Sequence, residues 1–174
     1  MTIAKPIFLI GFMGSGKTTW GRRLAKKFII PYIDTDLQIE TEVGKPISRI
    51  FEEEGEPLFR QKEVDLLNQL TKTAAVVSTG GGLPCFANNM EVINSLGISV
   101  YLKLPPKALH NRLMLERSKR PLIAHLSNED LLDFIETKLV EREEIYLQAK
   151  VIVNVLKADV NSLAEHLSKI LASS

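Results

Sequence analysis

The sequence predicts an α/β protein built on a parallel β-sheet with helices on both faces. Two observations lead to this fold class: short apolar runs alternate along the chain with longer helical patterns, and the first run leads directly into a glycine-rich turn. With 174 residues, 45% of them hydrophobic and 25% charged, the chain has the size and composition of one globular domain. We therefore expect a single domain over residues 1–174.

Five short runs of apolar and β-branched residues predict the strands, because a parallel sheet covered on both faces needs apolar side chains on both. These runs cover residues 7–10, 32–34, 75–78, 99–102 and 151–153. The carboxyl ends of parallel strands lie at one edge of the sheet, where ligands bind. The residues that follow each run are therefore the candidate site residues.

Six longer segments carry Leu, Ile or Val at three- and four-residue spacings, which predicts helices with one buried face. They cover residues 17–28, 57–72, 89–96, 106–115, 129–150 and 160–171. Two other stretches, 44–56 and 116–127, lack this periodicity and contain glycine or proline. We expect these two stretches to be mobile elements over a site.

Composition argues against several classes of protein. The 22 Lys and Arg nearly balance the 21 Asp and Glu, so no basic surface for nucleic acid is expected. Cys85 is the only cysteine and cannot form an internal disulfide, which favours a cytoplasmic location. No apolar stretch reaches the roughly 20 residues that a membrane-spanning helix needs, so no membrane association is expected. We take a monomer as the default.

The strongest local signal is the segment GFMGSGKT at 11–18, which fits G-x-x-x-x-G-K-[ST] at every fixed position. In such a loop, backbone N–H groups and a helix N-terminus surround the phosphates. Lys17 is then expected to reach the β- and γ-phosphates, and Thr18 to bind Mg²⁺. A glycine-rich turn with no ligand is the alternative, but Lys and Thr occupy the required positions between a strand and a helix. The predicted nucleotide-binding residues here are Gly14, Ser15, Gly16, Lys17, Thr18 and Thr19.

The loop alone leaves open whether the nucleotide acts as a switch or donates its phosphate to an acceptor. The Asn-Lys-x-Asp segment of guanine-specific switches is absent from the sequence. A chain of 174 residues also leaves little room for motor or assembly machinery. These observations favour a small-molecule kinase, with a non-catalytic nucleotide-binding module as the alternative from another class.

Two acids follow the second predicted strand at a spacing of two, Asp34 and Asp36. On an extended chain this spacing puts both side chains on one face. One acid could then hold Mg²⁺ through water while the other meets the acceptor hydroxyl; the alternative for Asp36 is a helix cap. The segment FRQKE at 59–63 and the glycines at 80–82 add a charged group and a place for close backbone approach, although the glycines would also suit a simple flexible turn.

Taken together, these segments resemble the shikimate kinases, which are P-loop NTPases of the nucleoside-monophosphate-kinase-like group. The resemblance covers nearly the whole chain, and the order and spacing of its motifs make it specific. It implies a five-stranded parallel sheet, an acceptor-binding segment at about 36–63 and a lid at about 116–127. The matching motifs are GxxGxGKT at 11–18, DxD at 34–36, FRxxE at 59–63, GGG at 80–82, RPL at 120–122 and RxxxY at 142–146.

The resemblance also implies roles for two arginines. Arg60 and Arg142 would bind the carboxylate of shikimate, for which the guanidinium fork is well suited, and Glu63 would orient Arg60. Without the family pattern, Arg60 and Glu63 would be interpreted as an exposed i,i+3 ion pair worth about 0.2 to 0.5 kcal/mol. Arg142 has a similar alternative, a place on the charged face of the predicted helix 129–150.

The remaining implied roles concern the hydroxyls, the lid and the metal. Asp36 would meet the ring hydroxyls, including the attacking one, beside the backbone of Gly81 and Gly82. Arg120 of the lid would join the ATP-binding residues, so that the implied catalytic residues are Lys17, Asp36 and Arg120. Mg²⁺ would be held by Thr18 and, through water, by Asp34.

The implied reaction is the ATP-dependent phosphorylation of the shikimate 3-hydroxyl, giving shikimate 3-phosphate and ADP. A gluconate-type kinase of the same fold is the closest alternative enzyme, and it should lack the FRxxE and GGG motifs. One departure from the family concerns adenine: many relatives have a stacking arginine seven residues before the lid arginine, where this chain has Leu113 with Arg112 beside it. The adenine-contacting residues therefore stay unassigned.

Overall fold

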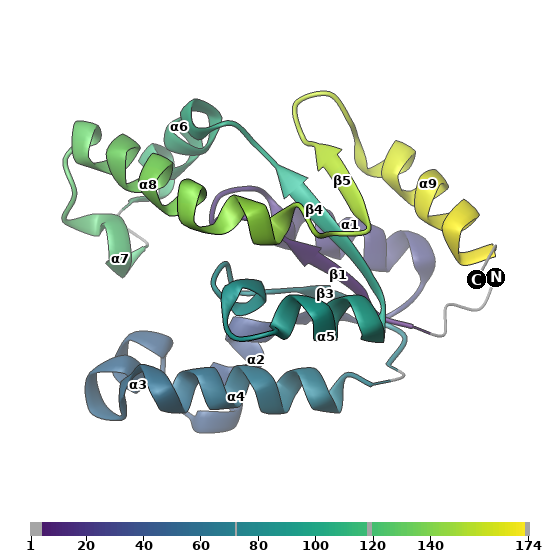
Figure 1. The fold of residues 1–174 in the computed structure, drawn as a ribbon, viewed down its shortest axis with the longest axis horizontal. Coiled ribbons are helices and arrows are strands. Elements are labelled where there is room, and N and C mark those ends of the chain that lie inside the picture. Colours follow the sequence, from purple (N-terminus) through teal and green to yellow (C-terminus); the bar gives the residue numbers. More distant parts are fainter. Residues whose placement is uncertain (1–4, 72, 118–119, 173–174) are drawn as a thin grey trace.

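The structure is a computed structural model that describes residues 5–71, 73–117 and 120–172 (Figure 1). Its centre is a parallel sheet of five strands in the order β2-β3-β1-β4-β5. This confirms the predicted five-stranded parallel α/β fold. The strands are β1 (Ile7–Ile10), β2 (Tyr32–Asp34), β3 (Val76–Ser78), β4 (Ile98–Lys103) and β5 (Val151–Asn154).

Strand β1 lies at the centre of the sheet, and all four of its residues are fully buried. Leu9 is in register with Ser78 of β3 on one side and with Val100 of β4 on the other. The chain leaves β1 toward β2 and later crosses back to β4, so the strand order reverses beside β1. In sheets of this kind, ligands bind outside the carboxyl ends of the strands at such a reversal.

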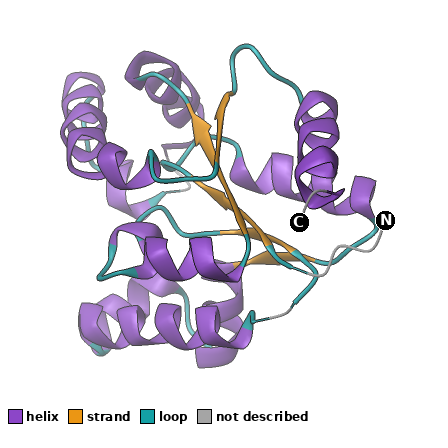
Figure 2. Ribbon diagram, turned by 45° about the vertical axis from the view of Figure 1, so that its right-hand side comes forward, coloured by secondary structure: helices purple, strands orange, loops and turns teal. Residues whose placement is uncertain are grey.

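Helices cover both sides of the sheet (Figure 2). The segments predicted at 17–28, 89–96, 106–115 and 160–171 are helical to within one residue of the expected bounds. The helices are α1 (Lys17–Phe28), α2 (Thr35–Val43), α3 (Ile47–Glu53), α4 (Gly55–Gln69), the 3₁₀ turn η1 (Leu83–Cys85), α5 (Asn89–Leu96), α6 (Pro106–Glu116), α7 (Pro121–Ala124), α8 (Asn128–Tyr146) and α9 (Val160–Ala172).

Two of the longer helices differ from their predicted bounds. Helix α8 ends at Tyr146, four residues before the expected end at Lys150, because the chain must turn there to enter β5. Lys150 closes this turn by donating to the carbonyls of Asn94 and Gly97. Helix α4 begins at Gly55 and ends at Gln69, and Lys72, the expected end, lies outside the described residues.

The stretch 44–56, expected to be aperiodic, instead holds the whole of α3 and the start of α4. Helix α3 has seven residues, of which only Ile50 is buried, so it is too short to show a helical period in the sequence. Its first N–H, that of Ile47, donates to the Glu40 carboxylate at 2.8 Å, and Lys45 forms ion pairs with Glu53 and Glu54. Local contacts therefore hold this segment in a defined position beside α4.

Within the part of the chain that the structure describes, no helix is both long and apolar enough to cross a lipid bilayer.

Candidate functional site

The turn between β1 and α1 forms a phosphate-binding loop. Gly11, Gly14 and Gly16 all have positive φ angles of 138°, 78° and 100°, which glycine adopts without steric cost. Gly16 is the N-cap of α1 and offers no side-chain cap, so the first N–H groups of the helix remain available to an anion. The predicted loop is therefore confirmed as a local structure.

Lys17 is the first residue of α1, and its Nζ donates to the carbonyl oxygens of Gly11 at 2.7 Å and Phe12 at 3.0 Å. Burial lowers the pKa of Lys17 to about 8, while the nearby Asp36 carboxylate acts in the opposite direction. A phosphate oxygen would compete well with these two carbonyls, because it carries a negative charge that attracts the ammonium group and they are neutral.

A cavity of about 410 Å³ opens above this loop at the carboxyl ends of β2 and β3. Five of the six residues predicted on the loop line it, namely Gly14, Gly16, Lys17, Thr18 and Thr19. The side chain of Ser15 does not line the cavity; it is 1% exposed, and its hydroxyl lies against Gly11. The rest of the lining comprises Met13, Asp34, Asp36, Ser78, Thr79, Gly80, Gly81, Arg112, Leu115, Glu116 and Arg120.

The two acids after β2 have different surroundings. Asp34 ends the strand and caps α2, accepting from the Leu37 N–H at 3.4 Å and from the Tyr32 hydroxyl at 3.1 Å. Asp36 already belongs to the first turn of α2. The expectation that both acids share one face of an extended chain was therefore wrong, because the helix begins at Thr35. The cap considered for Asp36 is formed by Asp34, yet both carboxylates line the nucleotide cavity.

The Asp36 side chain is partly buried, and one of its carboxylate oxygens lacks a hydrogen bond. This oxygen, Oδ1, has no partner among the described residues. Burial and the negative charge of Asp34 together raise the pKa of Asp36 to about 6. A methyl group added at Gly80 would lie 2.5 Å from Oδ1, so a larger residue there would displace the carboxylate. Because Asp36 lines the cavity, its carboxylate suits a ligand hydroxyl that donates to it.

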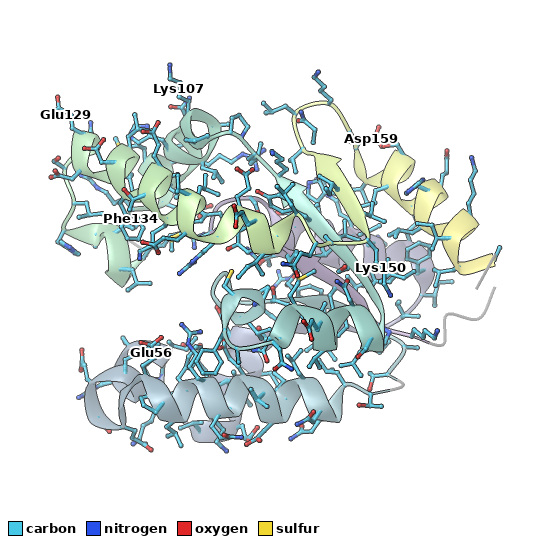
Figure 3. The ribbon with its side chains drawn as sticks, viewed as in Figure 1. Glu56, Lys107, Glu129, Phe134, Lys150 and Asp159 are labelled. Carbon is cyan, nitrogen blue, oxygen red and sulfur yellow. The ribbon has the colours of Figure 1, made fainter. Side chains whose placement is uncertain are left out.

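Arg60, on α4, is held by two carboxylates. Its Nη1 donates to Glu63 at 2.7 Å, and its Nε and Nη2 donate to Glu56 at 3.0 and 2.9 Å. Glu63 is 1% exposed, and burial raises its pKa to about 7 against the opposing charge of Arg60. The alternative of an exposed ion pair is therefore excluded. In Figure 3, Glu56 lies on the side of α4 that faces α7 and α8.

Arg142 approaches the same place from α8. Its guanidinium carbon lies 6.0 Å from the centre of the Phe12 ring. A Cβ at Gly81 would lie 3.5 Å from Nη1 of Arg142, and one at Gly82 would lie 3.1 Å from both terminal nitrogens of Arg60. The two arginines thus converge on neighbouring glycines, although they are 82 positions apart in the chain.

These arginines line a second cavity of about 340 Å³. Its other wall is apolar and includes Ile47, Phe51, Phe59 and Leu122, none of which the sequence singled out as a site residue. Its lining residues are Met13, Asp36, Ile47, Phe51, Phe59, Arg60, Glu63, Gly80, Gly81, Gly82, Arg120, Leu122 and Arg142.

The two cavities meet. Among the described residues, those that line both are Met13, Asp36, Gly80, Gly81 and Arg120. A ligand in each cavity would therefore touch the same few side chains, with one carboxylate and one guanidinium at the junction. This arrangement permits direct transfer of a group between two bound ligands.

Arg120 reaches the junction from the predicted lid. Its Nη2 donates to Glu116 at 2.7 Å, and its buried Nε has no partner among the described residues. Of the stretch 116–127, residues 118–119 lie outside the described residues, and the short helix α7 occupies Pro121–Ala124. Closure of this segment over a nucleotide stays a prediction.

Arg112 is a cavity residue for which no role was predicted from the sequence. Its Nη1 donates to the carbonyls of Gly14 and Ser15, both at 3.3 Å, and it lines the nucleotide cavity. Leu113, the position where relatives carry a stacking arginine, is fully buried and packs against Gly14. The adjacent Arg112 thus faces the nucleotide cavity. Only the rotation of helix α6 relative to the loop could have indicated this.

The side-chain oxygen atoms that line the nucleotide cavity are suitable ligands for Mg²⁺. Thr18 and Asp34 both line it, and hydroxyl and carboxylate oxygens are the ligands that Mg²⁺ prefers. Among the described residues no group of three or more His, Cys, Asp and Glu could hold a metal ion. Mg²⁺ needs no such cage, because it usually keeps several waters and binds one or two carboxylates together with phosphate oxygens.

The chain is similar in sequence to known proteins of one family. A family model described as shikimate kinase matches residues 13–172. The chain is 43% identical to a shikimate kinase of Bacteroides fragilis over 147 residues, covering 84% of this chain and 82% of that protein. It is 40% identical to the one of Phocaeicola vulgatus over 172 residues, covering 94% and 98%.

Solved structures give the same result. A shikimate kinase of Bacteroides thetaiotaomicron superposes with a TM-score of 0.87 at 38% identity, covering 97% of this chain and 98% of that one. A shikimate kinase of Acinetobacter baumannii in complex with shikimate gives 0.81 at 35% identity, covering 97% and 93%. A gluconokinase of Sinorhizobium meliloti shares the fold alone, with 19% identity. With the two joined cavities and the matched motifs, the comparisons lead to one conclusion: this chain belongs to the shikimate kinase family.

Proposed function

We propose that this protein transfers the γ-phosphate of ATP to the 3-hydroxyl of shikimate, giving shikimate 3-phosphate and ADP. The observation that carries the proposal is the junction of a phosphate-binding cavity with a second cavity that is lined by two arginines and the carboxylate residue Asp36. Shikimate is a small cyclohexene with one carboxylate and three hydroxyls. Each kind of group in the second cavity has a counterpart on this molecule.

In the nucleotide cavity, the backbone of residues 14–19 would surround the phosphates, with Lys17 on the β- and γ-phosphates. Lys17 would exchange its bonds to the Gly11 and Phe12 carbonyls for the phosphate oxygens. Arg112 would contact the part of the nucleotide outside the transferring phosphate, since it lies on the wall over the start of α1. When bound, Mg²⁺ held by Thr18 and, through water, by Asp34 would neutralise phosphate charge.

In the acceptor cavity, Arg60 and Arg142 would bind the carboxylate. Arg60 donates a 2.7 Å hydrogen bond to Glu63, so that the guanidinium keeps a fixed orientation. Asp36, which lines both cavities, would accept the hydrogen bond of the attacking hydroxyl. The glycines 81 and 82 leave the space into which the acceptor fits beside the two guanidinium groups.

The reaction follows from this placement. The 3-oxygen of shikimate forms a bond to the γ-phosphorus while the bond from that phosphorus to the β,γ-bridging oxygen breaks, and ADP leaves. Asp36, with its pKa raised to about 6, is ionised at neutral pH and holds the hydroxyl proton as the bond forms. Lys17 and Arg120 neutralise charge on the transferring group. Because such transition states are loose, positioning contributes most of the rate.

We also propose that the protein acts as a cytoplasmic monomer. Its one cysteine, Cys85, is free and needs no oxidising compartment, and the junction of the two cavities is formed entirely within one chain. Light scattering at micromolar concentration tests this proposal: a mass near 19.5 kDa is expected, and a mass twice as large would contradict it.

The proposed reaction is tested by measuring ADP release with shikimate, gluconate, a nucleoside monophosphate or no acceptor added in parallel. Release should require shikimate and ATP together. The Lys17→Ala variant, purified in the same way, controls for contaminating kinases and should be inactive. Equal release with gluconate, or release independent of any acceptor, would contradict the proposal.

A further inference from the structure

The glycine segment between the two cavities is anchored at both ends by buried hydroxyl groups. At one end, the Gly80 N–H donates to Thr35 Oγ1 at 2.9 Å. At the other end, the Tyr146 hydroxyl donates to the Gly81 carbonyl at 2.6 Å. Thr35 and Tyr146 are both fully buried. The RxxxY motif contains Tyr146, but the reaction described above gives this residue no task.

Each of these hydroxyls comes from a neighbour of an acceptor-binding residue. Thr35 directly precedes Asp36 at the start of α2. Tyr146 follows Arg142 by four residues on α8, so both side chains lie on the same face of the helix. The pair of hydrogen bonds therefore joins the element that carries Asp36 to the element that carries Arg142, through two glycine residues.

The spacing across this segment is tight. A Cβ at Gly80 would lie 2.5 Å from the Asp36 carboxylate, and a Cβ at Gly81 would lie 3.5 Å from the Arg142 guanidinium. Consecutive glycines are the most conformationally free backbone, so without anchors this segment would sample many positions. A small displacement of it would change the distance between the group that meets the hydroxyl and the group that meets the carboxylate.

Tyr146 is suited to this role because its hydroxyl keeps its proton. Burial raises the pKa of Tyr146, and the groups that face it are Cys85, Tyr101 and Arg142. The ring is fixed by Tyr101 of β4, whose centroid is 5.1 Å away at an interplanar angle of 40°. The hydroxyl is thus a constant donor on a rigid side chain.

We propose that Thr35 and Tyr146 are positioning residues that fix the glycine segment 80–81, and through it the spacing between Asp36 and Arg142 that one acceptor must span. This inference rests on the proposed function. The site is then specific for acceptors in which the carboxylate and the reacting hydroxyl are separated by the distance between Arg142 and Asp36. A variant in which the segment moves would hold the competent geometry only part of the time, which lowers the apparent acceptor affinity by that fraction.

The test compares Tyr146→Phe and Thr35→Val with two matched controls. Tyr101→Phe removes a second buried tyrosine hydroxyl from the same ring pair, and that hydroxyl has no hydrogen bond to the glycine segment among the described residues. Thr35→Ser keeps the hydroxyl that Thr35→Val removes. Losing one such bond should raise the Kd and KM for shikimate about three- to ten-fold, with those for ATP changed less than about two-fold. Tyr101→Phe and Thr35→Ser should resemble the wild type.

A double variant adds a test of shared action. Because the two hydroxyls hold adjacent residues of one segment, Tyr146→Phe combined with Thr35→Val should weaken shikimate binding by less than the product of the single effects. Equal losses of shikimate and ATP affinity in the single variants would overturn the inference and leave both residues with a role in packing only. If Tyr101→Phe weakened shikimate binding as much as Tyr146→Phe does, the inference would be overturned in the same way.

Hydrogen exchange separates this inference from the proposed function, because it needs no ligand. In the free protein, the amides of Leu83 and Cys85 donate to the carbonyls of Gly80 and Gly82. Their exchange should be faster in Tyr146→Phe than in the wild type and unchanged in Tyr101→Phe. Unchanged exchange in Tyr146→Phe contradicts the positioning role, whereas a wild type that fails to phosphorylate shikimate contradicts the proposed function.

Discussion

Replacing Asp36 with asparagine should make the protein more stable at pH 8, although it damages the site. The folded protein raises the pKa of this carboxyl from its ordinary value of 3.8 to about 6, chiefly by burial. Below pH 3.8 the carboxyl is protonated in both the folded and the unfolded chain, so its burial carries no electrostatic cost. Above pH 6 it is ionised in both, and the folded state bears the full cost of burying the charge.

The size of the effect follows from the two pKa values. The difference between 3.8 and about 6, at about 1.4 kcal/mol for each pH unit, corresponds to roughly 3 kcal/mol at pH 8. At pH 4.5 only about 1 kcal/mol of this cost remains. Asparagine has a similar shape without the charge. The pKa of about 6 already includes the opposing attraction of Lys17, so we expect a net gain of up to about 3 kcal/mol at pH 8 and clearly less at pH 4.5.

Urea unfolding of the ligand-free protein at both pH values measures this gain. Asp133→Asn, an exposed change on α8, is the matched control and should alter stability by less than about 0.5 kcal/mol at either pH. In the same Asp36→Asn preparation, turnover at saturating shikimate should fall, because the attacking hydroxyl loses its acceptor. If Asp36→Asn were equally destabilised at pH 8 and pH 4.5, the claim that burial of the ionised Asp36 carboxylate destabilises the fold would be refuted.

Three other predictions concern the bound ligands. Lys17→Ala should abolish turnover in a protein that still folds, as measured by ADP release and circular dichroism; near wild-type turnover would refute its role. Arg60→Ala and Arg142→Ala should each weaken shikimate binding in calorimetry by roughly ten- to a hundred-fold while ATP affinity barely changes. The carboxamide analogue of shikimate should bind the wild type poorly, and its affinity should fall little further in Arg142→Ala. If Arg142→Ala lowered the affinity for the analogue as much as that for shikimate, the carboxylate would be bound elsewhere. Arg120→Ala should lower kcat much more than shikimate affinity, and ATP should slow hydrogen exchange across 116–127 in the wild type; normal turnover with unchanged exchange would make this segment an ordinary loop.

The sequence predicted the sheet well because β1, β3 and β4 are short apolar runs that are almost entirely buried, although β2 and β5 are more exposed. The phosphate-binding loop was equally clear, since its fixed residues are adjacent in the chain and its backbone needs glycine at defined positions. The roles proposed for Arg60 and Arg142 come only from the family resemblance. Their charged neighbours in the sequence are equally typical of a solvent-exposed helix face.

Other features depend on contacts that no local pattern contains. Helix α2 buries only Thr35 and Ile39, so no helix was predicted over residues 35–43, and the different surroundings of the two acids were missed with it. Arg112 binds loop carbonyls nearly a hundred positions earlier in the chain, and the hydroxyl of Tyr146 bonds a glycine carbonyl 65 positions earlier. Such pairs are set by how the helices pack on the sheet and become visible only in three dimensions.

The most direct test of the central claim is to identify the product by phosphorus–proton correlation NMR after incubation with ATP, Mg²⁺ and shikimate. In the proposed reaction, the acceptor carboxylate binds Arg60 and Arg142 in one cavity, and the reacting hydroxyl meets Asp36 where this cavity joins the nucleotide cavity. The account predicts one new phosphate ester, coupled to the proton on carbon 3 of shikimate, formed in equal amount to ADP. Inorganic phosphate as the only new product, or an ester on a different hydroxyl, would contradict it.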